Sequence, residues 1–320
     1  MGIFANPLTD LLEYEDFSRD FLKGTDPVGM TGCIDSEKVH FMSTFLGEKK
    51  VQLVVTYNEQ RAREIEEDYK LFCSQVYVIP PRDLIFFSAD LQGNAIIAER
   101  MKAFAALYQN EAKVIITTMD ALMSAAVPFE QLMSHVIKLK EGDELDLEKL
   151  KHDLTVMGYE RVGRVEEPGQ FTVHGGIADV YPLTMEVPVR IELWGDEIDT
   201  IRCFEPQSQR SMDQIECVSV FPAAEVIADD TARRRAVGMI QNELESQLAV
   251  FKKAKEPDKA KRLREETNRI LEALGEDVVL EAPDSYISYF YPRTVQLSEY
   301  FDEKNTLVFL DEPMRLKERG

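Results

Sequence analysis

The sequence is poor in the residues that build metal centres and disulfide frameworks. Its 320 residues include four cysteines and four histidines, and no two cysteines form a Cys-x-x-Cys pair. This spacing argues against a zinc ribbon or a disulfide-stapled fold and fits the reducing environment of the cytoplasm. A Gly-x-Ser-x-Gly nucleophile elbow is missing as well. We therefore predict neither a catalytic residue nor a metal site.

Long apolar segments are also missing. No stretch approaches the ~18 uninterrupted apolar residues that a membrane-spanning helix needs. The first residues are acidic and lack both a basic segment and an apolar core, so they do not resemble a signal peptide. These absences predict a soluble, cytoplasmic protein without a membrane partner.

Basic residues are scarce. The chain has 37 Lys and Arg against 58 Asp and Glu, which gives a formal charge of -21. Such a charge repels a nucleic-acid backbone and forfeits the counterion release that drives non-specific binding. Within residues 128–222, nine basic and nineteen acidic side chains give -10. We predict that this region is a poor DNA binder, although the sum does not exclude local basic patches.

An alternation of strand-like and helical segments begins at Pro27. With 320 residues and 44% hydrophobic content, the chain is long enough for two or three domains. The alternation predicts an α/β domain with a largely parallel sheet covered by helices. An amphipathic stripe within residues 1–23 is expected to pack on this domain. The expected strands are 51–56, 76–79 and 114–117, and the expected helices are 58–72 and 95–108.

The clearest strand signal lies within residues 171–204. From residue 189, every second side chain is apolar and points to one face of the strand. Arg190 and Trp194 occupy positions of the other row, so they point to the opposite, polar face. Gly175-Gly176 and Gly195-Asp196 are placed to close hairpins. Trp and Arg are both enriched at binding hot spots, so this face is a candidate interface. The alternative is that a helix or a neighbouring domain of the same chain covers Trp194.

Two runs in this region carry a resemblance to a known family. They read Gly-Gly-Ile-Ala-Asp-Val-Tyr-Pro at 175–182 and Arg-Ile-Glu-Leu-Trp-Gly-Asp-Glu-Ile-Asp at 190–199. Together they resemble the UvrA-binding domain shared by UvrB and the transcription-repair coupling factors. The resemblance to the N-terminal module of the coupling factors extends over nearly the whole chain. It implies that Arg190, Trp194 and His174 contact UvrA, although His174 stands where the family more often has arginine.

The loop that starts at Gly29 reads Gly-Met-Thr-Gly-Cys-Ile-Asp-Ser, which is similar to a degenerate P-loop. A working P-loop reads Gly-x-x-x-x-Gly-Lys-Ser/Thr, and its lysine reaches the β and γ phosphates. Gly29 and Ser36 keep their places and Gly32 lies between them, but Ile34 replaces the second glycine and Asp35 replaces the lysine. An anion there repels a triphosphate. A loop that never bound nucleotide is the alternative, and both interpretations predict no ATPase.

A strand of Walker B type, Thr-Leu-Val-Phe-Leu-Asp-Glu, occupies residues 306–312. In a working site Asp311 and Glu312 would hold Mg²⁺, but without a P-loop we expect them to be caps or loop acids. Both motifs belong to one sheet of a helicase-type lobe, so the segment between them contains an insertion. We predict a degenerate P-loop helicase-type lobe at 1–127, an inserted α+β UvrA-binding domain at 128–222, and a helical segment that returns to the lobe at 223–320.

Two functions follow from these patterns. The first is a non-catalytic module of a transcription-repair coupling factor, which recruits UvrA to lesions where RNA polymerase has stalled. The resemblance implies that ATP, Mg²⁺, RNA polymerase and DNA are bound by other regions of such a factor. This chain would then have no cofactor, and its partners would be UvrA and the remaining domains of its full-length chain.

The alternative is a UvrB-like, ATP-dependent damage-verification subunit. The substituted P-loop opposes it. So does the stretch 80–90, which passes directly towards a helix, whereas the resemblance implies that UvrB has a Tyr-rich hairpin at this point.

Overall fold

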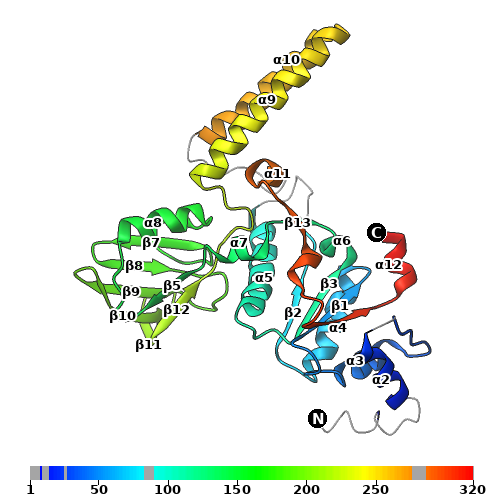
Figure 1. The fold of residues 1–320 in the computed structure, drawn as a ribbon. Helices are drawn as coiled ribbons and strands as arrows, with labels where there is room; N and C mark the ends of the chain where they lie inside the picture. The colour runs from blue at the N-terminus through cyan, green and yellow to red at the C-terminus, as the bar shows by residue number, and fades with distance from the viewer. Residues whose placement is uncertain (1–7, 9–13, 25–26, 83–89, 276–285, 320) are drawn as a thin grey trace. The chain divides into compact units, whose positions relative to one another are not determined.

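A computed structural model of the chain describes residues 8, 14–24, 27–82, 90–275 and 286–319 (Figure 1). The chain divides into two units, each built from segments that are distant in the sequence. The first unit combines residues 1–82, 102–124 and 297–320, and the second combines 83–101 and 125–296. The borders predicted at 127/128 and 222/223 stay predictions. Residues 83–89, on which the comparison with the UvrB hairpin depends, lie outside the described residues.

A four-stranded parallel sheet is the framework of the first unit. In spatial order its strands are β14 (Thr306–Leu310), β1 (Val51–Thr56), β3 (Val114–Thr118) and β2 (Val76–Ile79). Strand β14 pairs with β1 in parallel, from Thr306 beside Val51 to Leu310 beside Val55. The predicted parallel sheet is therefore confirmed, and it includes the strand of Walker B type.

Helices α3 and α4 pack on this sheet. Asn58 caps α4 by accepting a hydrogen bond from the Arg61 amide at 2.8 Å, and Ile65 and Tyr69 are fully buried against the strands. The described part of the amphipathic N-terminal stripe also packs on this unit, since Phe17 lies 4.9 Å from Phe41 in an edge-to-face contact. The helices are α2 (Tyr14–Lys23), α3 (Asp35–Ser43), α4 (Glu59–Lys70), α6 (Met119–Leu122), η2 (Leu297–Tyr300) and α12 (Pro313–Arg319), while α5 (Asp90–Tyr108) contributes to both units.

A six-stranded sheet dominates the second unit and confirms the strands predicted within 171–204. Its order is β11 (Ser211–Gln214), β10 (Glu197–Phe204), β9 (Val189–Trp194), β8 (Ile177–Val180), β7 (Gln170–His174) and β6 (Glu160–Arg161). The pairs are antiparallel except β6 with β7. One sheet face forms the core of this unit with α8 (Leu147–Val156) and the pair β5 (Ile137–Lys140) and β12 (Cys217–Val220).

The remaining elements of the second unit are mostly helical. Two long helices, α9 (Asp230–Ala254) and α10 (Pro257–Gly275), run side by side as a hairpin (Figure 1). Pro257 suits the first position of a helix because its missing amide hydrogen has no helical partner there. The others are α7 (Phe129–Met133), α11 (Ile287–Phe290) and the short pair β4 (Ala125–Ala126) and β13 (Val295–Gln296).

Gly158, which follows α8, is a site where only glycine fits. Its φ is +91°, and a Cβ placed there would lie 2.9 Å from the Ala224 Cβ and 3.3 Å from the Ala224 backbone nitrogen. We expect Gly158→Ala to lower the free energy of unfolding by about 2 kcal/mol, because the strain at positive φ adds to the clash. Gly163→Ala is the matched control, since a Cβ at Gly163 meets nothing within 4 Å. Urea denaturation of both variants makes the comparison, and equal stabilities would contradict it.

Candidate functional site

All three residues that the resemblance assigned to UvrA lie on one face of the six-stranded sheet. Side chains alternate along a strand, and Val189 and Ile191 of β9 point into the core, where they are fully buried. The opposite face, called the outer face below, therefore receives the intervening residues of β9. Across the strands, Asp179 pairs with Arg190, Ile177 with Glu192, and His174 with Ile177. The outer face includes His174, Ile177, Asp179, Arg190, Glu192 and Trp194, and the pairing also places Thr172, Thr200 and Arg202 on it.

Trp194 is the most exposed large apolar side chain of the outer face. It ends β9 and is 84% exposed. The two-residue turn Gly195-Asp196 follows, with Gly195 at φ +66°, and Glu197 pairs with Trp194 across the hairpin. Among the described residues of the second unit, no segment covers the tryptophan. A tryptophan side chain buries roughly 150–250 Å² when a partner covers it, so this position can contribute strongly to binding.

Arg190 is held by the sheet itself. Its guanidinium makes a bidentate ion pair with Asp179, with Nε–Oδ1 at 2.8 Å and Nη2–Oδ2 at 2.7 Å. It also lies 4.7 Å from the centroid of the buried Phe204 ring. The hydrogen bond to Asp179 outweighs burial and raises the pKa of Arg190. Only 21% of the side chain is exposed, so Arg190 offers less free surface than the sequence pattern suggests.

His174 and Ile177 form the exposed end of the first hairpin. The His174 ring is exposed, and its Nε2 lies 2.9 Å from the Thr172 Oγ1. Ile177, directly opposite, is 40% exposed. Sequence reasoning did not single out Ile177. The sequence does indicate its position. If Gly175-Gly176 form a two-residue turn, the residues on either side of the turn, His174 and Ile177, pair with each other and share one face.

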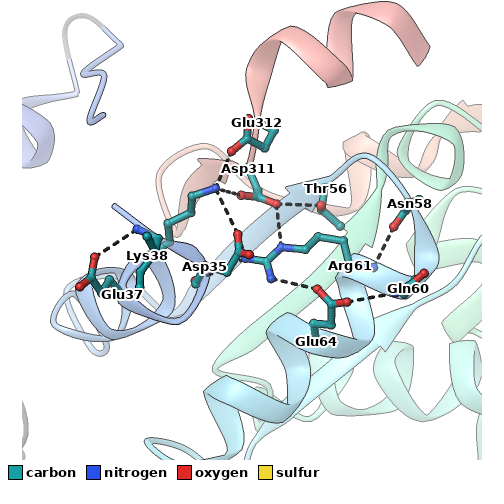
Figure 2. Close-up of polar contacts among 11 residues, drawn as sticks. Asp35, Glu37, Lys38, Thr56, Asn58, Gln60, Arg61, Glu64, Asp311 and Glu312 are labelled. Carbon is teal, nitrogen blue, oxygen red and sulfur yellow. Dashed lines mark hydrogen bonds and ion pairs between the residues drawn. The ribbon is translucent and has the colours of Figure 1, made fainter. Parts of the chain in front are cut away.

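The residues of the predicted nucleotide site lie in the first unit, where a polar cluster surrounds Asp311 (Figure 2). Asp311 is the residue directly after β14, and its side chain is 1% exposed. Its Oδ2 accepts hydrogen bonds from Thr56 Oγ1 at 3.0 Å and from Arg61 Nε at 3.3 Å. Its Oδ1 accepts one from Lys38 Nζ at 3.1 Å. Two cations of the same chain thus compensate this buried carboxylate.

Lys38 also connects Asp311 with two other predicted site residues. Its Nζ lies 2.6 Å from Glu312 Oε1 and 3.8 Å from Asp35 Oδ1. Burial opposes the charge of the ammonium group, but hydrogen bonds to Glu312 and Asp311 outweigh it and raise the pKa of Lys38. Arg61 approaches Asp35 at 3.4 Å as well. Sequence reasoning missed both cations, although Lys38 stands one helical turn after Asp35, where such a pair is expected.

The loop before α3 differs from a P-loop in its backbone as well as in its residues. Gly29 and Gly32 lie in this loop, Ile34 is the N-cap and is 67% exposed, and Ser36 lies in the first turn of the helix. A P-loop joins a strand to a helix. Here residues 27–34 contain no strand, and the described element before them is the helix α2. The strand that precedes a P-loop is therefore not seen among the described residues.

Lys38→Met tests the energetic role of the cluster. The change removes the ammonium group that bonds to Asp311 and Glu312, and a charge-assisted hydrogen bond contributes about 1.5–3 kcal/mol. Since Arg61 and Thr56 still bond to Asp311, we expect a loss of about 1–2 kcal/mol in the free energy of unfolding. Lys317→Met, at an exposed lysine of α12, should change it by less than about 0.5 kcal/mol. Thermal or urea unfolding that ranks the two variants equally would refute this role.

Two further kinds of site are not found where the structure describes the chain. In those residues, no group of three or more His, Cys, Asp or Glu side chains is placed to hold a metal ion. Nor does any described helix combine the length and the apolar character needed to cross a membrane.

Comparison with known families identifies the class of the second unit. Residues 137–225 match the family model described as the UvrB interaction domain. This segment includes the whole six-stranded sheet and hence the outer face with Trp194. The second unit therefore contains the segment that is similar to the UvrB interaction domain.

Similarity to particular proteins extends well beyond that domain. The chain is 30% identical to the transcription-repair-coupling factor of Bacillus subtilis (strain 168) over 98% of its length, and 31% identical to that of Staphylococcus haemolyticus (strain JCSC1435) over 93%. It spans 27% and 25% of these two relatives, respectively. The resemblance inferred from the two sequence runs is thus confirmed along nearly all of the chain.

Proposed function

We propose that this chain is a non-catalytic module of a transcription-repair coupling factor that recruits UvrA to lesions where RNA polymerase has stalled, as a step of nucleotide excision repair. UvrA docks on the outer face, with Trp194 as its anchor and with Arg190 and His174 beside it. The remaining domains of the full-length protein bind ATP, Mg²⁺, DNA and RNA polymerase. The protein acts in the cytoplasm.

The exposure of Trp194 is the observation that carries the proposal. A tryptophan that is 84% exposed at the end of a strand in a UvrB interaction domain is the residue type that dominates interface hot spots. Arg190 has a different role, because its pairing with Asp179 fixes the sheet beneath the contact. Glu192 pairs with Ile177 next to the tryptophan, so a partner with basic groups around an apolar pocket would be complementary.

The polar cluster around Asp311 supports an inactive nucleotide site in a degenerate helicase-type lobe. In a working site the acids of the Walker B strand face Mg²⁺ and the P-loop lysine faces the phosphates. Here Lys38 and Arg61 already pair with Asp311, so an incoming Mg²⁺ would have to displace internal ion pairs. Asp35 adds another negative charge next to Lys38. We infer that the cluster now stabilises the lobe and takes no part in hydrolysis.

Isothermal titration calorimetry tests the proposal. Titration of UvrA into the chain, without ATP or DNA, is expected to give saturable binding, and an absence of binding would refute UvrA recruitment. In a separate titration, Mg-ATP is expected to give no heat of binding. Saturable binding of Mg-ATP would instead favour the UvrB-like damage-verification function.

A further inference from the structure

The turn between α9 and α10 concentrates positive charge in an otherwise acidic chain. From Lys252 to Arg264, a segment called the hairpin tip below, seven side chains are basic and two are acidic, a net charge of +5. The remainder of the chain then carries -26. The seven basic residues are Lys252, Lys253, Lys255, Lys259, Lys261, Arg262 and Arg264.

These cations are exposed, and most of them are not neutralised by neighbours. All seven basic side chains of the tip are exposed to solvent. Lys259 pairs with Glu256 at 3.0 Å and Lys261 pairs with Glu265 at 3.9 Å. The other five form no ion pair within the described residues. A surface with five unpaired cations attracts polyanions over a distance of about 10 Å at moderate salt.

The backbone places these charges on both helices of one hairpin. Helix α9 ends at Ala254 and is capped by Lys255, which adopts a left-handed conformation with φ +56°, and α10 begins two residues later at Pro257. Between the two helices lies a groove of about 790 Å³, and its lining includes the cations Lys252, Lys255, Lys261 and Arg264 together with Phe251, Glu256 and Glu265. The cations of the two arms therefore converge on a common groove.

We propose that the hairpin tip binds the phosphate backbone of duplex DNA without sequence specificity. Lysine and arginine side chains on a helical scaffold are the groups that contact phosphates, and such contacts position a protein without reading bases. An acidic protein surface is the competing partner. Five of the seven basic residues of the tip are lysines, and lysine is depleted at protein–protein interfaces, so the composition favours DNA.

DNA binding at the hairpin tip is independent of the recruitment of UvrA. The outer face belongs to an acidic segment, since residues 128–222 carry -10, whereas the tip is basic. One region therefore suits a protein partner and the other suits a polyanion. Variants of the tip leave Trp194 unchanged, so a failure of one proposal can be separated from a failure of the other.

Fluorescence anisotropy with a labelled duplex of arbitrary sequence tests the proposal on the 320-residue chain. The tip variant replaces four exposed cations with glutamine, and the control variant replaces four exposed lysines elsewhere, so both variants have the same net charge. The tip variant carries Lys252→Gln, Lys253→Gln, Arg262→Gln and Arg264→Gln. The control variant carries Lys113→Gln, Lys149→Gln, Lys304→Gln and Lys317→Gln.

We expect the unaltered chain to bind the duplex at roughly 50 mM salt and to lose about 100-fold in affinity by roughly 200 mM, as about four phosphate contacts require. The tip variant should bind at least 10-fold more weakly, whereas the control should change less than 3-fold. Equal losses in both variants, or no binding by the unaltered chain at low salt, would overturn the proposal. Binding of polyglutamate without binding of the duplex would assign the tip to an acidic protein and overturn it as well.

Discussion

Replacing Trp194 with alanine is expected to weaken binding to UvrA by at least ~30-fold, or ~2 kcal/mol, as is typical for a hot-spot tryptophan. The folded state should be unaffected, because the side chain is 84% exposed and contributes little to the core. Isothermal titration calorimetry of the variant measures the loss. Leu71→Ala is the matched control, since Leu71 is a large apolar residue that is 75% exposed in the first unit. The same loss in both variants would mean that the outer face is not the docking surface.

Arg190→Ala is a poorer test of the same interface. Removal of the guanidinium leaves Asp179, which is 7% exposed, without the two hydrogen bonds that Arg190 donates to it. An uncompensated buried carboxylate destabilises the sheet, so weaker binding would mix loss of contact with loss of structure. The double variant Arg190→Met with Asp179→Leu removes both charges together. If it folds and retains UvrA binding, Arg190 acts only as a positioning residue.

Glu225→Ala is expected to cause the largest loss of stability, about 3–5 kcal/mol. Arg100 is fully buried, and its guanidinium is paired with the buried Glu225 carboxylate, with Nη2–Oε2 at 3.0 Å. In the variant, the Arg100 guanidinium is still buried on folding, but it no longer has the Glu225 carboxylate as its counter-charge. A urea unfolding curve that shifts by less than about 1 kcal/mol would contradict this account.

Two further variants distinguish the effect of breaking the ion pair from the general effect of removing an acidic side chain. Glu216→Ala removes an exposed acid of the same unit and should change the free energy of unfolding by less than about 0.5 kcal/mol. The double variant Arg100→Met with Glu225→Leu replaces both charges with apolar groups of similar length. It should recover most of the stability, because a buried ion pair and a well-packed apolar pair are often close in free energy.

Much of the fold was predictable because its signals are local. The apolar run Val51–Thr56 is followed by Asn58, whose side chain caps the next helix, and both features can be recognised within a few residues. The hairpin at Gly195-Asp196 also follows from a short motif. The Arg100–Glu225 pair was not predictable, since 125 residues separate its partners. Only the tertiary structure brings them together.

In the candidate site too, the local features were predictable and the contacts between distant residues were not. The alternation along β9 placed Trp194 on the outer face correctly, because strand periodicity alone determines it. The restraint of Arg190 was not predictable, since it depends on the register that sets Asp179 of β8 beside it. Asp311 likewise obtains its partners from α3, β1 and α4, which lie 250 to 273 residues earlier in the chain. Sequence patterns reveal which faces are polar, but the register between distant elements decides which polar groups are already paired.

Hydrogen exchange of the chain with and without UvrA tests the central claim most directly. Peptides that cover residues 174–177 and 192–198 should exchange more slowly in the complex, because the proposed docking would cover the exposed ends of both hairpins of the outer face. Peptides from α4 should exchange at the same rate in both states. Protection confined to the first unit, with none around Trp194, would show that UvrA docks elsewhere and would contradict the account.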